Sequence, residues 1–253
     1  MQPLRRILPA ILIALAILAV WELYCAWADV SPLILPAPSD VARALGTERA
    51  VISEHAASTL SVAALGFSTS VAFAFLISVA LHFLPPLERG LMPLFVVSQT
   101  VPLIALAPLM ILWFGFGLLP KMLLVILVTF FPMLVSLLSG YARASRDHLD
   151  LLASMGAGKA TLFRRVRLPS ARAAFFAGLR ISATYAIVAT IFAEYAGARR
   201  GIGIFILSAK NNFRADLVLA AVVVSATLTL LLLGAVRLVE RFSDRRRGHH
   251  AAH

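Results

Sequence analysis

One stretch of this sequence looks like part of a phosphate-binding loop. Gly156-Ala157-Gly158-Lys159-Ala160-Thr161 places a lysine after two glycines, and loops of this kind hold the phosphates of ATP when they match G-x-x-x-x-G-K-[ST] after a strand. The template fails twice, because Ala153 stands at the first glycine position and Ala160 follows the lysine. No strand is expected before it. We therefore expect this chain to bind no ATP.

Ionisable side chains inside long apolar segments are the second candidates for chemistry. Glu22, Arg180 and Glu194 stand in such segments, where a charge is costly and usually faces a partner or a water-filled cavity. Arg180 and Glu194 are therefore pathway candidates, together with Gln99 and Pro102. The alternatives are that Arg180 snorkels or pairs within a helix bundle and that Glu194 is merely interfacial.

The sequence offers no catalytic group and no metal site. Cys25 is its one cysteine, so no internal disulfide can form, and no Cys/His cluster has the spacing of a zinc site. His55, His82 and His148 stand far apart and on different expected sides of the molecule. We accordingly predict no catalytic residue, no metal ligand and no cofactor bound by this chain.

The elements that must position these residues are membrane spans. Hydrophobic residues make up 60% of the chain and charged residues 14%, and a helix of roughly 20 apolar residues crosses a bilayer while satisfying its own backbone hydrogen bonds. We predict an all-α membrane protein of one domain, residues 1–253. The six expected spans are Ile7 to Ala28, Ala56 to Leu84, Leu91 to Leu118, Lys121 to Ala142, Ala173 to Tyr195 and Leu217 to Val239.

The first apolar segment has an alternative interpretation. Arg5 and Arg6 precede it, and Ala26-Trp27-Ala28 resembles the small-residue cleavage site of a secretory signal peptide. The segment is longer than the 7 to 15 apolar residues usual for a signal peptide, and Trp21 and Tyr24 crowd the site. An uncleaved anchor is the simpler interpretation.

The basic residues orient the spans. With the N-terminus in the cytoplasm, 15 of the 23 Lys and Arg residues lie inside and seven outside, and Arg180 lies in a span. This positive-inside bias favours cytoplasmic N- and C-termini, with a basic cytoplasmic tail over residues 243–253. The formal charge of +11 is thus explained without nucleic acid, since the basic residues form no domain that could bind a duplex.

The cytoplasmic segment 143–170 combines charge with helical periodicity. Leu149, Leu152 and Ala153 follow i, i+3, i+4 spacing, and Leu162, Phe163 and Val166 repeat it after the glycine pair. We predict two short amphipathic helices, with Pro169 ending the second and beginning the next span. Such helices can lie on anionic headgroups through their arginines, or they can dock into a partner protein.

The spacing of this segment resembles the loop of ABC importer permeases, which reads E-A-A, three residues, G, nine residues, I-x-L-P. Here Asp150, Leu151 and Leu152 precede Gly156, and Val166-Arg167-Leu168-Pro169 follows after nine residues. The acid is Asp instead of Glu, and leucines replace the two alanines.

Other stretches extend the likeness over nearly the whole chain. They look like the nitrate, sulfonate and taurine branch of these permeases: Leu35 to Ser39, Gln99 to Gly117, Phe130 to Pro132, Gly178 to Ile181 and Glu194 to Gly203. The Gln99 to Pro108 and Phe130 to Pro132 stretches look most like permeases for hydroxymethylpyrimidine and related thiamine precursors.

This resemblance implies the type I fold of the binding-protein-dependent (MetI-like) permeases, with six transmembrane helices and a coupling loop in the bacterial inner membrane. The implied partners are an ATPase subunit that holds ATP and Mg, an extracytoplasmic substrate-binding protein, and a second permease copy, in a homodimer. The implied solute is small and polar. The coupling-loop residues would be Asp150, Leu151, Leu152, Ser154, Met155, Gly156, Ala157, Leu162, Phe163, Val166, Leu168 and Pro169.

Two other functions remain open from the residues themselves. Arg180 and Glu194 could serve a membrane enzyme, which would turn over substrate without any ATPase. The spans could also form a secondary transporter, which would work alone on an ion gradient.

Overall fold

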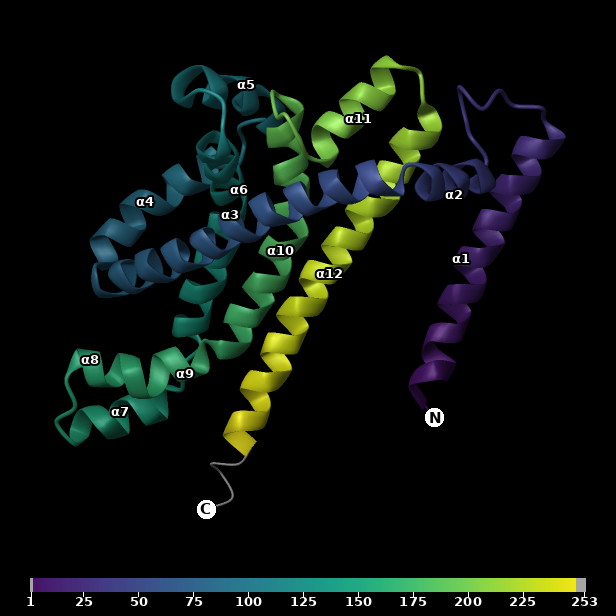
Figure 1. The fold of residues 1–253 in the computed structure, drawn as a ribbon. Coiled ribbons are helices and arrows are strands. Elements are labelled where there is room, and N and C mark those ends of the chain that lie inside the picture. The colour runs from purple at the N-terminus through teal and green to yellow at the C-terminus, as the bar shows by residue number, and fades with distance from the viewer. Residues whose placement is uncertain (1, 249–253) are drawn as a thin grey trace.

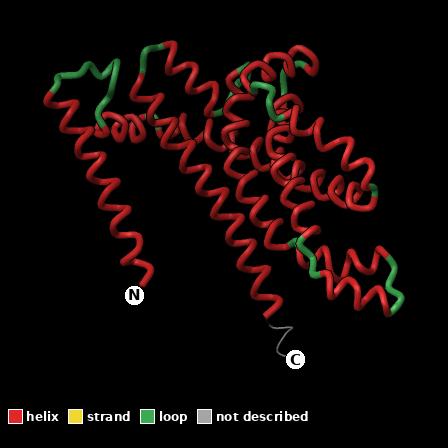
Figure 2. Tube along the Cα trace, turned by 180° about the vertical axis from the view of Figure 1, so that it is seen from behind, coloured by secondary structure: helices red, strands yellow, loops and turns green. Residues whose placement is uncertain are grey.

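The structure, a computed structural model, describes the backbone of residues 2–248 and the side chains of residues 8–244. Every regular element in this part of the chain is a helix, as Figure 2 shows, which confirms the all-α prediction. The elements are α1 (Gln2–Trp27), α2 (Pro38–Thr47), α3 (Arg49–Phe83), α4 (Pro85–Ser98), α5 (Leu103–Phe114), α6 (Leu118–Ala142), α7 (Arg146–Ser154), α8 (Lys159–Leu162), the π-helical turn η1 (Phe163–Arg167), α9 (Leu168–Ser170), α10 (Arg172–Tyr195), α11 (Ile202–Asn211) and α12 (Ala215–Gly248).

Five of the described helices are long and apolar enough to cross a membrane: α1, α3, α6, α10 and α12. They coincide with five of the predicted spans, because a backbone in hydrocarbon must close its hydrogen bonds within one helix. α3 and α12 run well beyond their apolar stretches, to 35 and 34 residues.

The predicted third span, Leu91 to Leu118, is not one straight helix. It is divided between α4 and α5, which are bent by 101° at a short break. Pro102 lies at this break with an extended backbone instead of inside a helix. A proline offers no N–H to the helix and disfavours the helical region for Val101 before it. The pair is a broken span or a re-entrant segment.

Three helices form the centre of the bundle, with α6 packed against both α3 and α10. Small residues bring them close: a Cβ on Gly66 would lie 2.8 Å from the Val125 Cβ, and one on Gly178 would lie 2.7 Å from the Ser136 Cβ. In lipid the hydrophobic effect does not drive helices together, so their association depends on van der Waals contacts, which close approach of this kind increases. α12 packs along α10.

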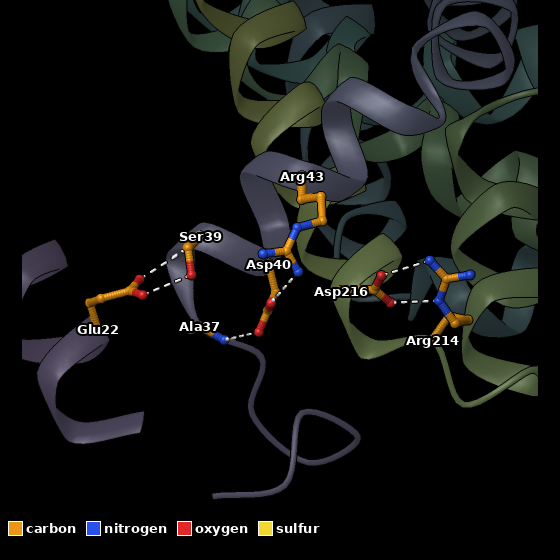
Figure 3. A network of polar contacts seen from close by, with 7 residues as sticks. All are labelled: Glu22, Ala37, Ser39, Asp40, Arg43, Arg214 and Asp216. Carbon is orange, nitrogen blue, oxygen red and sulfur yellow. Dashed lines mark hydrogen bonds and ion pairs between the residues drawn. The ribbon is translucent and has the colours of Figure 1, made fainter. Parts of the chain in front are cut away.

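α1 stands apart from this bundle and is attached through α2 (Figure 1). Figure 3 shows the attachment: Glu22 on α1 accepts hydrogen bonds from the Ser39 N–H at 3.0 Å and the Ser39 hydroxyl at 2.7 Å. Asp40 accepts from the Ala37 N–H at 3.2 Å. Both carboxylates thus satisfy N–H groups at the start of α2, which explains the charge of Glu22 in an apolar segment.

The start of α1, the end of α12 and the α7–α9 segment lie at one end of the bundle, while α2, α5 and α11 lie at the other (Figure 1). The predicted basic tail begins inside α12, which continues to Gly248, and residues 249–253 lie outside the described part of the chain.

Candidate functional site

The segment between α6 and α10 folds as the predicted pair of short helices. Ser145 caps α7, its hydroxyl accepting from the His148 N–H. Gly156 then turns the chain with φ +81°, in the left-handed region that glycine adopts without strain. The second helix runs through α8, η1 and α9. Pro169 lies one residue before the end of this helix at Ser170, and α10 begins at Arg172.

The predicted coupling-loop residues divide into two groups by exposure. Asp150, Leu151, Ser154, Met155 and Gly156 are exposed, and α7 buries none of its residues. Leu152, Ala157, Leu162, Leu168 and Pro169 are half-buried, whereas Phe163 and Val166 are buried against the bundle. The first helix therefore presents a free surface, and the second helix attaches the segment to the spans.

Leu151 on α7 and Met155, which directly follows α7, are large exposed apolar residues, at 59% and 75% exposure. They stand one turn apart and so share a face of the helix. Together with Asp150 this face offers an apolar anchor beside a charge, the combination that suits docking of a helix into a groove.

The pathway candidates Gln99 and Pro102 lie at the break between α4 and α5. Gln99 ends α4, and its side-chain amide donates to the Leu127 carbonyl at 3.2 Å. Leu127 is near the middle of α6, so the break lies at the depth of the middle of a span. A polar, exposed Gln99 at that depth fits a surface that faces a pathway or a protein partner better than one that faces lipid.

Arg180 is paired within the bundle. Its guanidinium lies 2.5 Å from the Glu240 carboxylate on α12, and Arg172 and Asp244 form a second pair between α10 and α12 at 2.5 Å. These pairs hold the two helices together near the end that carries the α7–α9 segment. The alternative of pairing inside the bundle is the one that the structure confirms.

The Glu194 side chain is fully buried, one residue before the end of α10. Its carboxylate accepts from the Thr59 hydroxyl at 2.9 Å and from the Gly203 N–H at 3.0 Å. The Thr59 oxygen also accepts from the Ile202 N–H at 2.8 Å. Three helices meet here, α3, α10 and the start of α11. The Glu194 carboxylate and the Thr59 hydroxyl each accept from one N–H group that a helix start leaves free.

Glycines make this junction possible. A Cβ on Gly201, whose φ is +132°, would collide with the Glu194 carboxyl group, and one on Gly203 would collide with the Ile191 carbonyl. The Gly201 N–H donates to Nδ1 of His55 at 3.0 Å. α11 is thus fixed to the bundle by four buried residues and these bonds.

Thr59 and His55 were not among the predicted site residues. Glu194, Gly201 and Gly203 lie within ten residues of one another, so their proximity follows from the sequence, but Thr59 is 135 residues from Glu194. No periodicity connects such distant positions. Among the described residues, no group of three His, Cys, Asp or Glu side chains could hold a metal ion.

A cavity of about 840 Å³ lies between the start of α6 and the segment that joins α10 to α11. Lys121, Arg199 and Arg200 are among its lining residues, with Ser58 as a neutral polar group. Arg200 pairs with Glu54 at 3.0 Å, whereas Lys121 and Arg199 form no ion pair with any described carboxylate. The cavity is therefore positively charged.

Comparison with known proteins places this architecture in a family. Residues 66–245 match the model of the binding-protein-dependent transport system inner membrane component. The chain is 31% identical over 227 residues to the formylaminopyrimidine transport permease protein ThiX of Halalkalibacterium halodurans, covering 89% of this chain and 90% of that one. It is 32% identical to the riboflavin transport system permease protein RibX of Chloroflexus aurantiacus, over 89% and 85% of the two chains. It is 31% identical to the taurine transport system permease protein TauC of Escherichia coli, over 89% and 84%.

These matches cover the bundle core, the α7–α9 segment and α11 together. They confirm the resemblance inferred from the loop spacing and exclude the membrane-enzyme and secondary-transporter alternatives, because ABC permeases are transport subunits whose energy comes from a separate ATPase. The chain belongs to the inner membrane components of binding-protein-dependent transport systems, and it is a multi-pass permease subunit of an ABC importer.

Proposed function

We propose that this permease carries an aminopyrimidine precursor of thiamine across the inner membrane and that its 143–170 loop docks onto the partner ATPase. An extracytoplasmic binding protein delivers the solute, and two copies of the chain enclose the pathway. The observation that carries the docking proposal is the exposed face of α7 formed by Leu151 and Met155.

Several features support docking of this loop on a cytoplasmic partner. It lies at the same end of the bundle as the start of α1 and the end of α12, and the excess of basic residues favours the cytoplasmic side for that end. Leu151 and Met155 remain exposed within the chain, so these two apolar side chains gain contact area only from a partner. The left-handed turn at Gly156 fixes the angle between the exposed helix and the anchored one.

Replacing Leu151 and Met155 with Asp tests the docking. Because neither side chain is packed against the bundle, we expect membrane insertion and folding to be unchanged. Co-purification of the ATPase should fall at least tenfold, since two charges would enter an apolar contact. Ile34→Asp is the control, because Ile34 is 79% exposed but lies in the loop at the opposite end. Normal ATPase recovery with the double variant would rule out docking through α7.

The enclosed pathway is supported by the α4–α5 break. α4 has no buried residue and α5 only Ala107, although this segment carries Gln99 at the depth of the middle of α6. A second copy related by a two-fold axis would cover this surface and leave polar groups facing a shared channel. Cross-linking through a cysteine placed at Val101, 43% exposed, tests whether a second copy covers this surface. We expect cross-linked dimers to form in the membrane. If this cysteine forms no dimer and reacts only with a lipid-soluble maleimide, the surface faces lipid and the proposal is wrong.

The aminopyrimidine proposal is supported by the similarity to the formylaminopyrimidine permease, which extends over nine-tenths of both chains. A second candidate is an organic sulfonate such as taurine, favoured by the cavity beside Lys121 and Arg199, because cations there would attract a sulfonate. The test is uptake into proteoliposomes holding the complete importer, with labelled hydroxymethylpyrimidine and labelled taurine. ATP-dependent uptake of the pyrimidine supports the proposal. Uptake of taurine alone, lost in Lys121→Gln, would replace it.

A further inference from the structure

Four aromatic rings from three elements meet where the α7–α9 segment joins the bundle. His82 and Phe83 end α3, Tyr141 lies at the end of α6, and Phe163 opens η1. The Phe163 ring lies 4.9 Å from His82, 5.1 Å from Tyr141 and 5.3 Å from Phe83, centroid to centroid. We call these four residues the aromatic joint.

Phe163 is the centre of the joint because it touches each of the other three rings. It is stacked on His82 with an interplanar angle of 30° and meets Tyr141 edge-on at 70°, two geometries in which aromatic pairs attract. It is 5% exposed. Unlike Leu151 and Met155, this residue faces the spans and is not available to a docking partner.

The backbone around Phe163 is built for this orientation. The Leu168 N–H donates to the Phe163 carbonyl, an i→i+5 bond that defines a π-helical turn. Such turns are rare and concentrate at functional sites. The wide turn places both Phe163 and Val166 against the bundle while Arg164 and Arg165 remain exposed.

Tyr141 links two spans at the joint. Its hydroxyl lies 3.0 Å from the Ser78 hydroxyl on α3, and both residues are buried, at 1% and 0% exposure. A satisfied buried pair of this kind fixes α3 and α6 relative to each other. A side chain pushed against Tyr141 therefore acts on two helices at once.

The peptide chain connects the coupling loop to α6 and α10 but not to α3. α10 follows α9 directly, and a Cβ on Gly140 of α6 would lie only 2.8 Å from the Ala171 Cα, so these connections are tight. α3 reaches the loop through the rings of His82 and Phe83 against Phe163. Since close-packed side chains do not compress, a displacement of the loop must move α3 if the joint is intact.

We propose that Phe163 is a positioning residue that transmits movement of the coupling loop to α3, so that α3, α6 and α10 move together when the ATPase subunits close. The proposal rests on the proposed docking of the loop onto the ATPase. It assigns transmission to a packed aromatic contact in addition to the covalent connection through Pro169.

The test uses the complete importer in proteoliposomes, comparing Phe163→Ala and Phe163→Leu with Val166→Ala. Val166 is the other buried residue of the same turn, at 8% exposure, and has no ring. We expect Phe163→Ala to retain the ATPase and to hydrolyse ATP within twofold of the unaltered protein. Solute transported per ATP should fall at least tenfold. For Phe163→Leu, the solute transported per ATP should lie between the values of the unaltered protein and Phe163→Ala, because leucine keeps most of the apolar volume. For Val166→Ala, the solute transported per ATP should stay within twofold of the unaltered protein.

A distance measurement separates transmission from a loss of stability. Spin labels at Leu76 on α3 and Ala153 on α7, both exposed, in a chain with Cys25→Ala, report the position of the loop relative to α3. In the unaltered joint the distance should be the same with and without ATP, whereas in Phe163→Ala or Phe163→Leu it should change or broaden with ATP.

An unchanged ratio and an unchanged distance in both Phe163 variants would overturn this inference while leaving the docking proposal intact. If no ATPase co-purifies with the protein that carries the unaltered loop, the docking proposal itself is overturned. If Phe163→Ala does not reach the membrane, Phe163→Leu decides by the same two measurements.

Discussion

The junction at the start of α11 gives the sharpest prediction about the fold, and Thr59→Val is its perturbation. The Thr59 hydroxyl donates to the Glu194 carboxylate at 2.9 Å and accepts from the Ile202 N–H at 2.8 Å. Valine has nearly the same shape but does neither, so a buried carboxylate loses one of its donors and a buried N–H loses its acceptor.

The expected cost follows from these two bonds. A buried polar group left without its partner costs about 1–3 kcal/mol, while side-chain hydrogen bonds measured inside membrane proteins average about 0.6 kcal/mol and reach about 1.7. About 1 kcal/mol for each bond gives a total of about 2 kcal/mol. Because every 1.4 kcal/mol is a factor of ten in an equilibrium, the start of α11 should open about 30 times more often.

Hydrogen exchange read by mass spectrometry, on the purified chain in lipid nanodiscs, measures this opening. The peptide covering residues 199–207 should exchange about 30-fold faster in Thr59→Val. Thr190→Val is the matched control, since Thr190 is equally buried but its hydroxyl donates only to the Ala186 carbonyl of its own helix at 2.8 Å. Exchange in Thr59→Val that equals exchange in Thr190→Val would refute the role assigned to Thr59.

Three further predictions concern glycines and an ion pair. Gly203→Ala should destabilise the chain by about 1–3 kcal/mol, because its Cβ would overpack the junction. The control is Gly46→Ala, which has open space around its Cβ and should keep the thermal unfolding midpoint of the unaltered protein. Equal midpoints for the two variants would contradict the clash. Arg180→Gln should lower stability by about 1 kcal/mol, and adding Glu240→Gln should cost less than the sum of the single changes if the pair at 2.5 Å is a true interaction. Gly156→Leu should cost about 1–2 kcal/mol of backbone strain at φ +81° and reduce the amount of ATPase that co-purifies. Gly156→Asn should lose less stability and less ATPase. Equal stability and equal ATPase recovery of the two variants would show that the turn conformation is unimportant.

The amino-acid sequence alone was enough to locate five of the spans and the two short helices of the coupling loop. Each span is a local property, because about 20 apolar residues in lipid have no alternative to a helix. The predicted Ala173 to Tyr195 span, for example, differs by one residue from α10 (Arg172–Tyr195). The turn at Gly156 was equally local, since its residue type permits a positive φ.

The break between α4 and α5 could not be read from apolar content. Leu91 to Leu118 is apolar enough to span the membrane, yet Pro102 and the residues before it bend the chain by 101°. A proline inside an apolar segment can kink, break or be absorbed by a helix. The outcome depends on neighbours such as the Leu127 carbonyl, which takes the Gln99 amide.

The partners of the charged and aromatic residues were decided only by the tertiary structure. The sequence shows that Glu194, Arg180 and Phe163 are present, but Glu194 meets Thr59 across 135 residues and Arg180 meets Glu240 across 60. Hydrophobic periodicity constrains residues within about two turns of a helix, whereas these contacts depend on which helices lie side by side. Packing of small residues such as Gly66 against Val125 fixes that choice, because only close approach aligns two helices in lipid.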